Sequence, residues 1–371
     1  MPTIITRRVM QAGLASKIMK NLVIKTPRGE RIIGPGQRVF IIAEMSGNHN
    51  QSIDRAYEII DAAAEAGVDA IKLQTYTADT ITINCDNEYF RIKESELWSG
   101  QTLYELYQKA YTPWDWQPKL KDYAEKKGLI FFSTPFDETS VDFLEKMNVG
   151  LYKIASLEIV DIPLLKRVAK TGKPVIMSRG ASTIADIELA LKTLKENGSG
   201  PVAVLHCLSS YPAESETMNL KTIKDIMEKF DVVSGLSDHS LDREVDIASI
   251  ALGASIIEKH FTLSREEGVD ASFSLLPKEM KELVKAIRKT EDALGEPFYG
   301  TAKGEEESVL FRKSLFVVLD IKKGEKFTKD NIRSIRPGQG LHPKYYEDIL
   351  GKAAKNNLVK GTPLSWELVE K

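Results

Sequence analysis

The stretch Val39-Phe40-Ile41-Ile42-Ala43-Glu44-Met45-Ser46-Gly47-Asn48-His49-Asn50 joins a short β-branched run to a polar turn. A run of this length and composition is typical of a buried β-strand. The turn then distinguishes two fold classes. An open doubly wound sheet usually has a glycine-rich turn after its first strand, but polar side chains fill those positions here. The stretch therefore favours a closed barrel over an open sheet.

Outward from this stretch, short β-branched runs alternate with longer segments of helical period, such as 53–66 and 183–196. This alternation is the pattern of βα units that build a parallel sheet. Eight runs are found, which is the number of strands in a (β/α)8 TIM barrel. The expected strands are 39–43, 70–73, 130–133, 151–154, 175–177, 202–205, 232–235 and 255–258.

The rest of the chain divides around a barrel domain that we place at 39–294. Residues 1–38 are expected to form an N-terminal extension whose hairpin turn is Thr26-Pro27-Arg28-Gly29 and which plugs the N-terminal face of the barrel. The Gly-, Pro- and charge-rich residues 295–308 are typical of a linker. In 309–371, the Lys-Gly turn pattern of 321–328 is echoed at 358–365. This echo predicts a small, pseudo-symmetric β-rich domain, too small to bury much surface without a neighbour.

An oversized segment, 76–114, separates the second and third expected strands. It carries the aromatic residues Trp98, Tyr104, Tyr107, Tyr111 and Trp114. Long βα loops of a barrel open on the catalytic face. We therefore expect this insert to wall a substrate pocket, the alternative being a surface helix that packs its own aromatic side chains.

Charge and composition exclude several classes of partner. The 51 Lys and Arg residues balance 53 Asp and Glu residues, so nothing in the charge favours nucleic acid or an acidic membrane surface. The longest apolar run, 247–257, is too short to span a bilayer. Cys85 and Cys207 form no disulfide framework, and polar residues interrupt the segment after Arg7 and Arg8, so no export signal is expected. These features predict a cytoplasmic protein.

Every expected strand ends in polar side chains, and the carboxyl ends of barrel strands share one mouth. A single polar residue at a strand end is usually a cap or a loop contact, but polar residues at all eight ends indicate a site. In chain order they are Glu44; Lys72 and Gln74; Ser133 and Thr134; Lys153, Ser156 and Glu158; Ser178 and Arg179; His206, Ser209 and Tyr211; Ser237, Asp238 and His239; and Glu258 and His260.

Two of these residues suit a metal. His239 and His260 end consecutive strands, so their imidazoles can converge on one divalent ion. Asp238 and Glu258 are available to orient the two rings. The alternative is a pair of histidines that bond only to loops.

Two lysines and three serines suit an anion. Lys72 and Lys153, with the hydroxyls of Ser156, Ser178 and Ser237, offer what a ligand with both phosphate and carboxylate groups requires. A Schiff base on Lys153 is the rival use. The histidine pair favours the metal route instead, because the two strategies are alternative ways to polarise a carbonyl.

Glu44 is a candidate base, or an anchor for a sugar hydroxyl. Cys207 follows His206, but adjacent strand residues face opposite sides, so the two are not expected to form a catalytic pair.

Six motifs, in order, resemble the sialic acid synthase family from about residue 39 to the C-terminus. They are Ile41-Ile42-Ala43-Glu44 with Asn48-His49-Asn50, Ile71-Lys72-Leu73-Gln74, Tyr152-Lys153-Ile154-Ala155-Ser156, Gly235-Leu236-Ser237-Asp238-His239, Glu258-Lys259-His260-Phe261-Thr262 and Arg336-Pro337-Gly338. The resemblance implies a metal-dependent condensation of phosphoenolpyruvate with an amino-sugar aldehyde, with C–O cleavage and release of phosphate.

The resemblance also implies roles for individual residues. It gives the metal, with Mn²⁺ expected before Mg²⁺ or Co²⁺, to His239 and His260, and makes these two residues catalytic together with Glu44 and Lys72. It implies that phosphoenolpyruvate is bound by Lys72, Lys153, Ser156, Ser178 and Ser237. It implies that the sugar is bound by Glu44, Glu158, Tyr211, Asp270 and Arg336. The last domain resembles the antifreeze-like (SAF, β-clip) module, whose matching arginine reaches the partner's sugar pocket in a domain-swapped homodimer.

The insert motifs at 97–104 and 110–114 resemble the pseudaminic acid synthase branch of that family, and Ser209 stands where neuraminate synthases usually have asparagine. The substrate of that branch, 2,4-diacetamido-2,4,6-trideoxy-L-altrose, lacks a C6 hydroxyl and suits an aromatic wall. N-acetylneuraminate or legionaminic acid synthesis, from N-acetylmannosamine or its 2,4-diacetamido analogue, remains the alternative. Two alternatives come from other functional classes. One is a phosphosugar aldolase. The other is a non-enzymatic protein whose last domain binds a surface and whose barrel has lost its activity, although polar residues at all eight strand ends argue against such a loss.

Overall fold

The computed structural model describes residues 21–26, 28–92 and 98–370 of the chain. Two compact units are present, Met1–Gly295 and Glu296–Lys371. The start of the expected N-terminal extension, on which the expectation about an export signal rests, lies outside the described residues, as do Pro27 of the hairpin turn and Leu97 of the insert motif.

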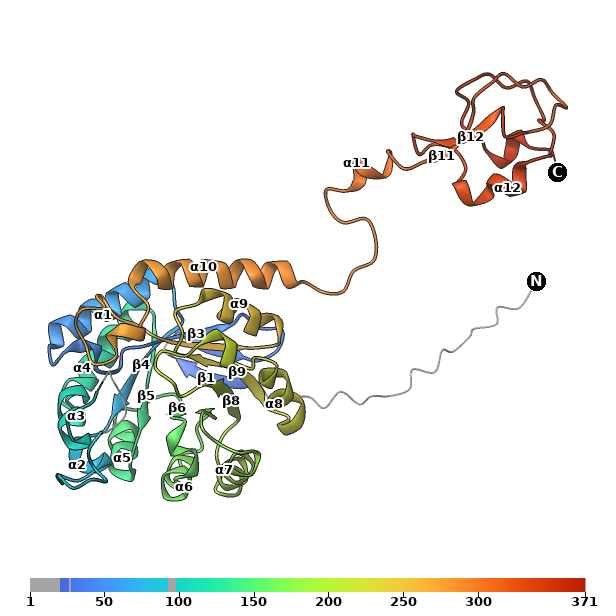
Figure 1. Ribbon diagram of the computed structural model, residues 1–371. Helices are drawn as coiled ribbons and strands as arrows, with labels where there is room; N and C mark the ends of the chain where they lie inside the picture. The colour runs from blue at the N-terminus through green and yellow to red at the C-terminus, as the bar shows by residue number, and fades with distance from the viewer. Residues whose placement is uncertain (1–20, 27, 93–97, 371) are drawn as a thin grey trace. The chain divides into compact units, whose positions relative to one another are not determined.

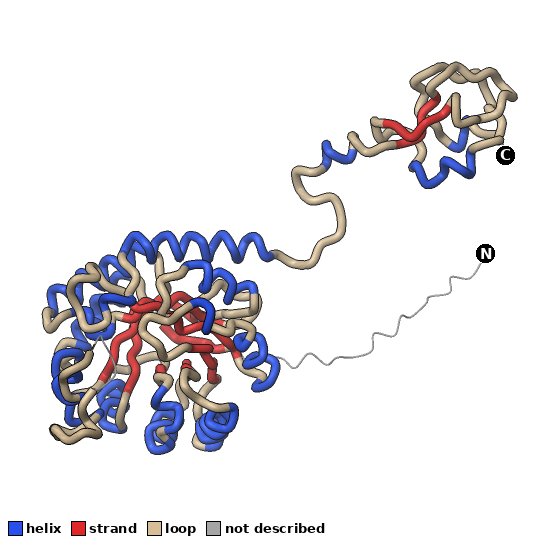
Figure 2. The backbone as a smooth tube through the Cα atoms, viewed as in Figure 1, coloured by secondary structure: helices blue, strands red, loops and turns tan. Residues whose placement is uncertain are grey.

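Eight parallel strands of the first unit close into a barrel, which confirms the predicted fold class and all eight predicted strands. The closure is made by the last strand, which pairs with the first so that Ile256 lies opposite Phe40. Figure 2 shows the strands at the centre of the unit with the helices around them. The barrel strands are β3 (Phe40–Glu44), β4 (Ala70–Thr75), β5 (Ile130–Pro135), β6 (Tyr152–Ile154), β7 (Val175–Ser178), β8 (Val202–Cys207), β9 (Val233–Asp238) and β10 (Ile256–His260).

Helices follow the barrel strands along the first unit (Figure 1), and α1 shows how their ends are fixed. The Ser52 hydroxyl accepts a hydrogen bond from the Arg55 amide at the start of α1, which ends at Gly67 with φ +84°; both features satisfy groups left free at a helix end. The helices are α1 (Ile53–Ala66), α2 (Ala78–Ile81), α3 (Leu103–Ala110), α4 (Gln117–Lys127), α5 (Glu138–Lys146), α6 (Ile162–Ala169), α7 (Ile184–Glu196), α8 (Thr222–Phe230), α9 (Arg243–Ala251) and α10 (Pro277–Leu294). Within the described ranges, no helix has the length and apolar character needed to cross a membrane.

Side chains alternate along each barrel strand and so build two separate cores. In β3, Ile41 and Ala43 pack outward against the helices, whereas Phe40 and Ile42 belong to a second cluster inside the barrel. The inner cluster continues into the antiparallel hairpin of β1 (Leu22–Thr26) and β2 (Gly29–Ile33), whose Leu22, Ile24 and Ile33 are fully buried in it. The expected hairpin is thus present, and its apolar side chains extend the core at the N-terminal end of the barrel.

In the second unit, β11 (Ser314–Val317) pairs antiparallel with β12 (Ile332–Ile335), and the helices are α11 (Glu306–Val309) and α12 (Tyr346–Ile349). The two echoed segments pair with each other: Ile321 and Leu358 exchange backbone hydrogen bonds of 2.8 Å. The glycines of the two Lys-Gly turns, Gly324 and Gly361, have φ of +82° and +92°, a conformation that costs other residues free energy.

His49, in the turn after β3, fixes the insert to the barrel. Its Nδ1 accepts a hydrogen bond from the Gln51 amide at 3.1 Å, so Nε2 carries the proton and donates it to Thr112 Oγ1 at 3.1 Å. Burial lowers the pKa of His49 to about 4. The folded protein therefore holds this imidazole neutral, whereas the unfolded chain protonates it below about pH 6.5.

We predict that His49 makes the folded state less stable as the pH falls. Between about pH 7.5 and 5 the unfolded chain gains a proton that the folded state excludes, which costs about 2 kcal/mol; below about pH 4 both states are protonated and this loss stops growing. The measurement is urea unfolding at both pH values, compared with His49→Gln, whose amide cannot titrate. The variant should lose less stability on acidification, and equal losses in the two proteins would contradict the assignment.

Candidate active site

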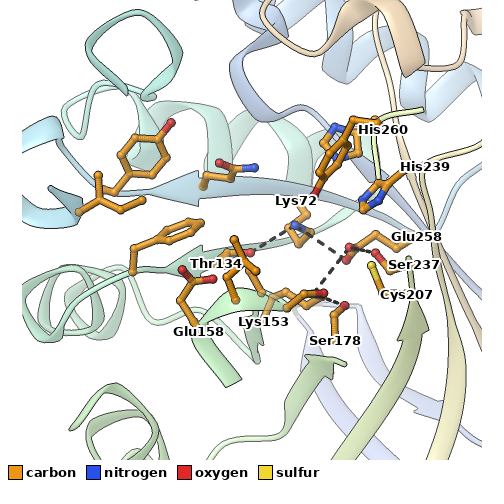
Figure 3. A pocket seen from close by; sticks show the side chains of 18 of the residues that line it. Lys72, Thr134, Lys153, Glu158, Ser178, Cys207, Ser237, His239, Glu258 and His260 are labelled. Atoms are coloured by element: carbon orange, nitrogen blue, oxygen red, sulfur yellow. Dashed lines mark hydrogen bonds and ion pairs between the residues drawn. The ribbon is translucent and has the colours of Figure 1, made fainter. Parts of the chain in front are cut away.

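A pocket opens at the carboxyl ends of the barrel strands, where the predicted polar residues meet (Figure 3). Most residues that the sequence singled out for the site line it. The insert contributes Tyr76, Ile81 and Tyr107, so part of it walls this pocket as expected, although of its five aromatic residues named above only Tyr107 lines the pocket. The lining residues are Lys72, Gln74, Tyr76, Ile81, Tyr107, Thr134, Phe136, Lys153, Ala155, Ser156, Leu157, Glu158, Ser178, Cys207, Tyr211, Ser237, His239, Glu258 and His260.

Two lysines and two glutamates alternate at the inner end of the pocket. Lys72 Nζ lies 2.6 Å from Glu44 Oε2 and 3.8 Å from Glu258 Oε2, and Lys153 Nζ lies 3.7 Å from Glu258 Oε1. All four side chains are more than nine-tenths buried. Because unpaired buried charges are strongly unfavourable, each ammonium stays charged only through its carboxylate neighbours.

The direction of each pKa shift follows from this balance. Burial alone lowers the pKa of Lys72, but Glu258 and Glu44 outweigh burial and hold it above its ordinary value. For Lys153 burial wins and lowers the pKa. Burial raises the pKa of Glu44, whereas Lys153 and Lys72 outweigh burial and lower the pKa of Glu258. Glu44 is therefore the more readily protonated of the two carboxylates.

Hydroxyl groups surround these charges and can add donors to an anion. Lys153 Nζ donates to Ser178 Oγ at 2.7 Å, and Ser237 Oγ donates to Glu258 Oε1 at 2.9 Å. Ser156 Oγ accepts a hydrogen bond from the Gly180 amide at 3.0 Å. A methyl group on Gly180 would stand 2.7 Å from that oxygen, so only glycine fits here. No pattern in the sequence pointed to Gly180, because the atoms that exclude a side chain there belong to Ser156 and Ser209, in the segments after β6 and β8.

His239 and His260 stand together on one side of Lys72, as Figure 3 shows. Their ring centroids are 5.3 Å apart. Nδ1 of His239 lies 2.9 Å from the Leu208 carbonyl, so it donates its proton there and Nε2 is left unprotonated. His260 Nδ1 is buried without a hydrogen-bond partner among the described residues. Burial lowers the pKa of both rings, which keeps them in the neutral form that binds metals.

This donor set fits a divalent ion held by two imidazole nitrogens. In the described part of the chain, no group of three or more His, Cys, Asp or Glu side chains is arranged to hold a metal ion. The remaining coordination positions would therefore fall to substrate and water oxygens, as catalytic metal sites require open positions.

A third group of side chains joins β3, β4 and the loop after β10. Gln74 Nε2 donates to Glu44 Oε1 at 3.1 Å and to Ser46 Oγ at 3.0 Å. The Ser46 hydroxyl in turn donates to Asp270, whose Oδ2 is 4.0 Å from His260 Nδ1. Burial raises the pKa of Asp270 to about 6. Glu44 and Asp270 therefore lie in one network behind the histidines, although only the resemblance, and no pattern in the sequence, pointed to Asp270.

Across the pocket from the histidines, Glu158 faces an aromatic wall. Its Oε2 is buried without a hydrogen-bond partner in the described residues, and burial raises its pKa to about 7. Tyr76 contacts both Phe136 and Tyr107, with ring centroids 5.1 and 5.5 Å apart. Tyr211, which is 39% exposed, stacks on His239 with ring centroids 4.3 Å apart.

Two of the strand-end residues face away from the pocket, and Arg336 lies in the second unit. Asp238 was expected to orient the imidazole rings, and this is wrong: it bonds to Lys259 and Ser240 and to neither ring, because it faces away from the pocket that the preceding Ser237 lines. Cys207 lines the pocket while His206 bonds to the Met218 carbonyl, so the two face opposite sides as predicted. Arg336 lies exposed in the second unit.

Comparison with known proteins gives matches along most of the chain. The NeuB family matches residues 59–299 and the SAF domain matches residues 312–370. A pseudaminic acid synthase of Campylobacter jejuni is 43% identical over 88% of this chain and 96% of that protein. An N,N'-diacetyllegionaminic acid synthase of the same species is 37% identical over 86% and 97%. The crystal structure of the spore coat polysaccharide biosynthesis protein SpsE of Bacillus subtilis aligns with a TM-score of 0.62 and 37% identity over 92% of this chain and 98% of that one.

Proposed function

Because this chain belongs to the NeuB family and ends in a SAF domain, we propose that it is an enzyme that condenses phosphoenolpyruvate with an amino-sugar aldehyde. The observation that carries the proposal is the buried cluster of Lys72 and Lys153, with serine hydroxyls, beside the paired His239 and His260. One part of this pocket suits an anion, and the other suits a carbonyl to be polarised.

The sugar that we propose is 2,4-diacetamido-2,4,6-trideoxy-L-altrose, which would make the product pseudaminic acid. The higher identity to a pseudaminic acid synthase than to a legionaminic acid synthase supports this choice. The wall of Tyr76, Tyr107 and Phe136 also supports it, because these aromatic side chains suit the sugar end that lacks a hydroxyl group. The legionaminic precursor is the second candidate.

In the proposed reaction, Lys72, Lys153, Ser156, Ser178 and Ser237 bind the phosphate and carboxylate of phosphoenolpyruvate. C3 of phosphoenolpyruvate forms a bond to the aldehyde carbon, water adds at C2, and the C2–O bond breaks so that inorganic phosphate leaves. Held this way, the two reactants meet in a fixed orientation, which lowers the entropic part of the barrier.

The new hydroxyl needs a proton at the former aldehyde oxygen. Glu44 and Asp270 both have pKa values raised by burial and are the proposed proton donor and sugar anchor on that side of the pocket. When bound at His239 and His260, a divalent ion, Mn²⁺ first among the candidates, supplies Lewis-acid polarisation of the aldehyde.

The second unit gives a reason to propose a domain-swapped homodimer. Its Arg336 is exposed and has the five-donor guanidinium that suits sugar oxygens and carboxylates. We propose that this arginine binds the sugar in the pocket of the partner subunit.

Phosphate release from phosphoenolpyruvate tests the proposed reaction. With Mn²⁺ and the altrose we expect release that a chelator abolishes, because the chelator removes the ion that polarises the aldehyde. N-acetylmannosamine and the legionaminic precursor serve as competing substrates in parallel assays. Faster phosphate release with either of them would overturn the proposed sugar substrate. Phosphate release that is unchanged by the chelator would overturn the proposed metal dependence.

Substitution His239→Ala should lower kcat by about a thousandfold, since Lewis-acid activation contributes several kcal/mol. His206→Asn is the matched control, because His206 is a buried histidine of the neighbouring strand whose ring bonds to a loop carbonyl outside the pocket. It should keep most of the activity. Steady-state kinetics of both variants, with thermal unfolding to check the fold, decides the point; near-normal turnover by His239→Ala would remove this residue from the mechanism.

Substitution Arg336→Ala should raise the KM for the sugar about tenfold or more, the loss expected for a charged hydrogen bond, while the KM for phosphoenolpyruvate stays nearly unchanged. Mixing this variant with His239→Ala tests whether Arg336 acts in the partner subunit. A mixed dimer then contains one pocket with both residues intact, so the wild-type KM for the sugar should return in that pocket. A KM that stays at the value of Arg336→Ala after subunit exchange would show that Arg336 does not act across the dimer.

A further inference from the structure

A buried ion cluster lies behind the two histidines, on the opposite face of the strands from the pocket. Lys259 of β10 has a side chain that is only 1% exposed, and Asp238 of β9 and Asp246 of α9 are fully buried. Lys259 Nζ is 2.6 Å from Asp238 Oδ2, 2.7 Å from the Ser240 carbonyl oxygen and 3.4 Å from Asp246 Oδ2. The ammonium thus donates two hydrogen bonds, to Asp238 and to Ser240, and forms a longer ion pair with Asp246, whose pKa burial raises to about 8.

The alternation of side chains places this cluster where it is. Asp238 and Lys259 are directly paired across β9 and β10, and their neighbours Ser237 and Glu258 line the pocket. The charges of Asp238 and Lys259 therefore point into the layer between barrel and helices, which elsewhere is filled by apolar side chains.

The cluster also contacts the chain next to each histidine, on both sides of His239 and on one side of His260. His239 lies between Asp238 and Ser240, and both of these residues bond to the Lys259 ammonium. His260 directly follows Lys259. The Asp238 carboxylate closes the turn around His239 by accepting bonds from the Ser240 amide at 2.8 Å and the Ser240 hydroxyl at 2.9 Å.

The ring and the carbonyl oxygen of His239 make their hydrogen bonds to a segment other than β10. Its ring is oriented by the Leu208 carbonyl, and its carbonyl accepts a bond from the Ala213 amide at 3.2 Å. Both partners belong to the segment after β8, so neither connects His239 to the strand that carries His260. The backbone ladder already pairs β9 with β10, and the side-chain bonds of Lys259 add a second connection at the level of the two rings.

Stability alone does not account for such a cluster. Replacing a buried ion pair with apolar side chains is often neutral or stabilising, because burial removes charges from water. What the charges add is direction, since an ammonium with three oxygen partners fixes the atoms around it.

We propose that Lys259 is a positioning residue that sets the separation of His239 and His260 for binding a divalent ion. The inference rests on the proposed metal site. Lys259 does not touch substrate or metal; it acts through the backbone that flanks each imidazole.

Direct Mn²⁺ binding tests the inference without relying on turnover. The free Mn²⁺ signal in electron paramagnetic resonance is titrated with the full-length protein carrying Lys259→Met with Asp246→Asn, a pair that removes the ammonium and one of the two carboxyl groups beside it. The matched control is Asp246→Asn alone, which removes the same acid and keeps the bonds of Lys259. The double variant should bind Mn²⁺ about tenfold more weakly or worse, as is typical when groups that orient metal ligands are lost, and the control should bind it as the wild type does.

Binding of phosphoenolpyruvate without metal separates positioning from a general loss of structure. The anion site uses Lys72 and Lys153, so its affinity should be retained in the double variant. Mn²⁺ affinity equal to that of the wild type, or an equal loss of both ligands, would overturn the inference.

Two further variants, Asp238→Asn and His239→Ala, cover the cases in which the double variant does not fold or the metal site itself is absent. If the double variant does not fold, Asp238→Asn keeps the side-chain shape while weakening its bond to Lys259. That variant should also bind Mn²⁺ more weakly, and wild-type affinity in it would refute the positioning role. His239→Ala reports on the metal site itself: if it binds Mn²⁺ as tightly as the wild type, the proposed metal site fails and the inference with it, whereas a loss confined to His239→Ala defeats the positioning role alone.

Discussion

The alternation of side chains along eight parallel strands is the constraint on which the barrel unit depends. Each inward position contributes either to the apolar cluster of Phe40 and Ile42 or, at the carboxyl end, to the pocket. Each outward position packs against helices, as Ile41 does. A shift of one residue in any strand would exchange the two sets and bury the pocket charges under helices. Fold and site are therefore set by the same register.

Compensation of charge governs the pocket itself. Lys72 and Lys153 are held among carboxylates that keep an otherwise unfavourable pair of buried ammonium groups in place. An anionic ligand brings its own charges to the same lysines, and the carboxylates then hold fewer of their bonds. The raised pKa of Glu44 and the lowered pKa of Glu258 show that the two glutamates are already unequal before any ligand enters.

The sequence predicted the parts of this molecule that depend on local pattern. Period and composition predicted the eight strands, and the polar residue that ends each strand predicted the pocket, because a closed barrel brings strand ends together whatever their distance along the chain. Asp238 shows the limit of that reasoning, because its position at a strand end suggested a partner for imidazole. Its neighbour Ser237 faces the pocket, and since successive side chains of a strand point to opposite faces, Asp238 faces the helices instead. Gly180 and Asp270 depend on contacts between distant segments, for which one sequence carries no local signal.

The hairpin of β1 and β2 affects the direction from which a ligand can reach the buried lysines. Leu22, Ile24 and Ile33 join the inner core at the N-terminal end, so the hairpin covers that end of the barrel, whereas the pocket lies at the carboxyl ends of the strands. Lys72 and Lys153 are almost fully buried, whereas Tyr211 is 39% exposed. The lysines therefore mark the inner end of the pocket and Tyr211 its outer end, so an anion bound by the lysines lies deeper in the barrel than any group that contacts Tyr211.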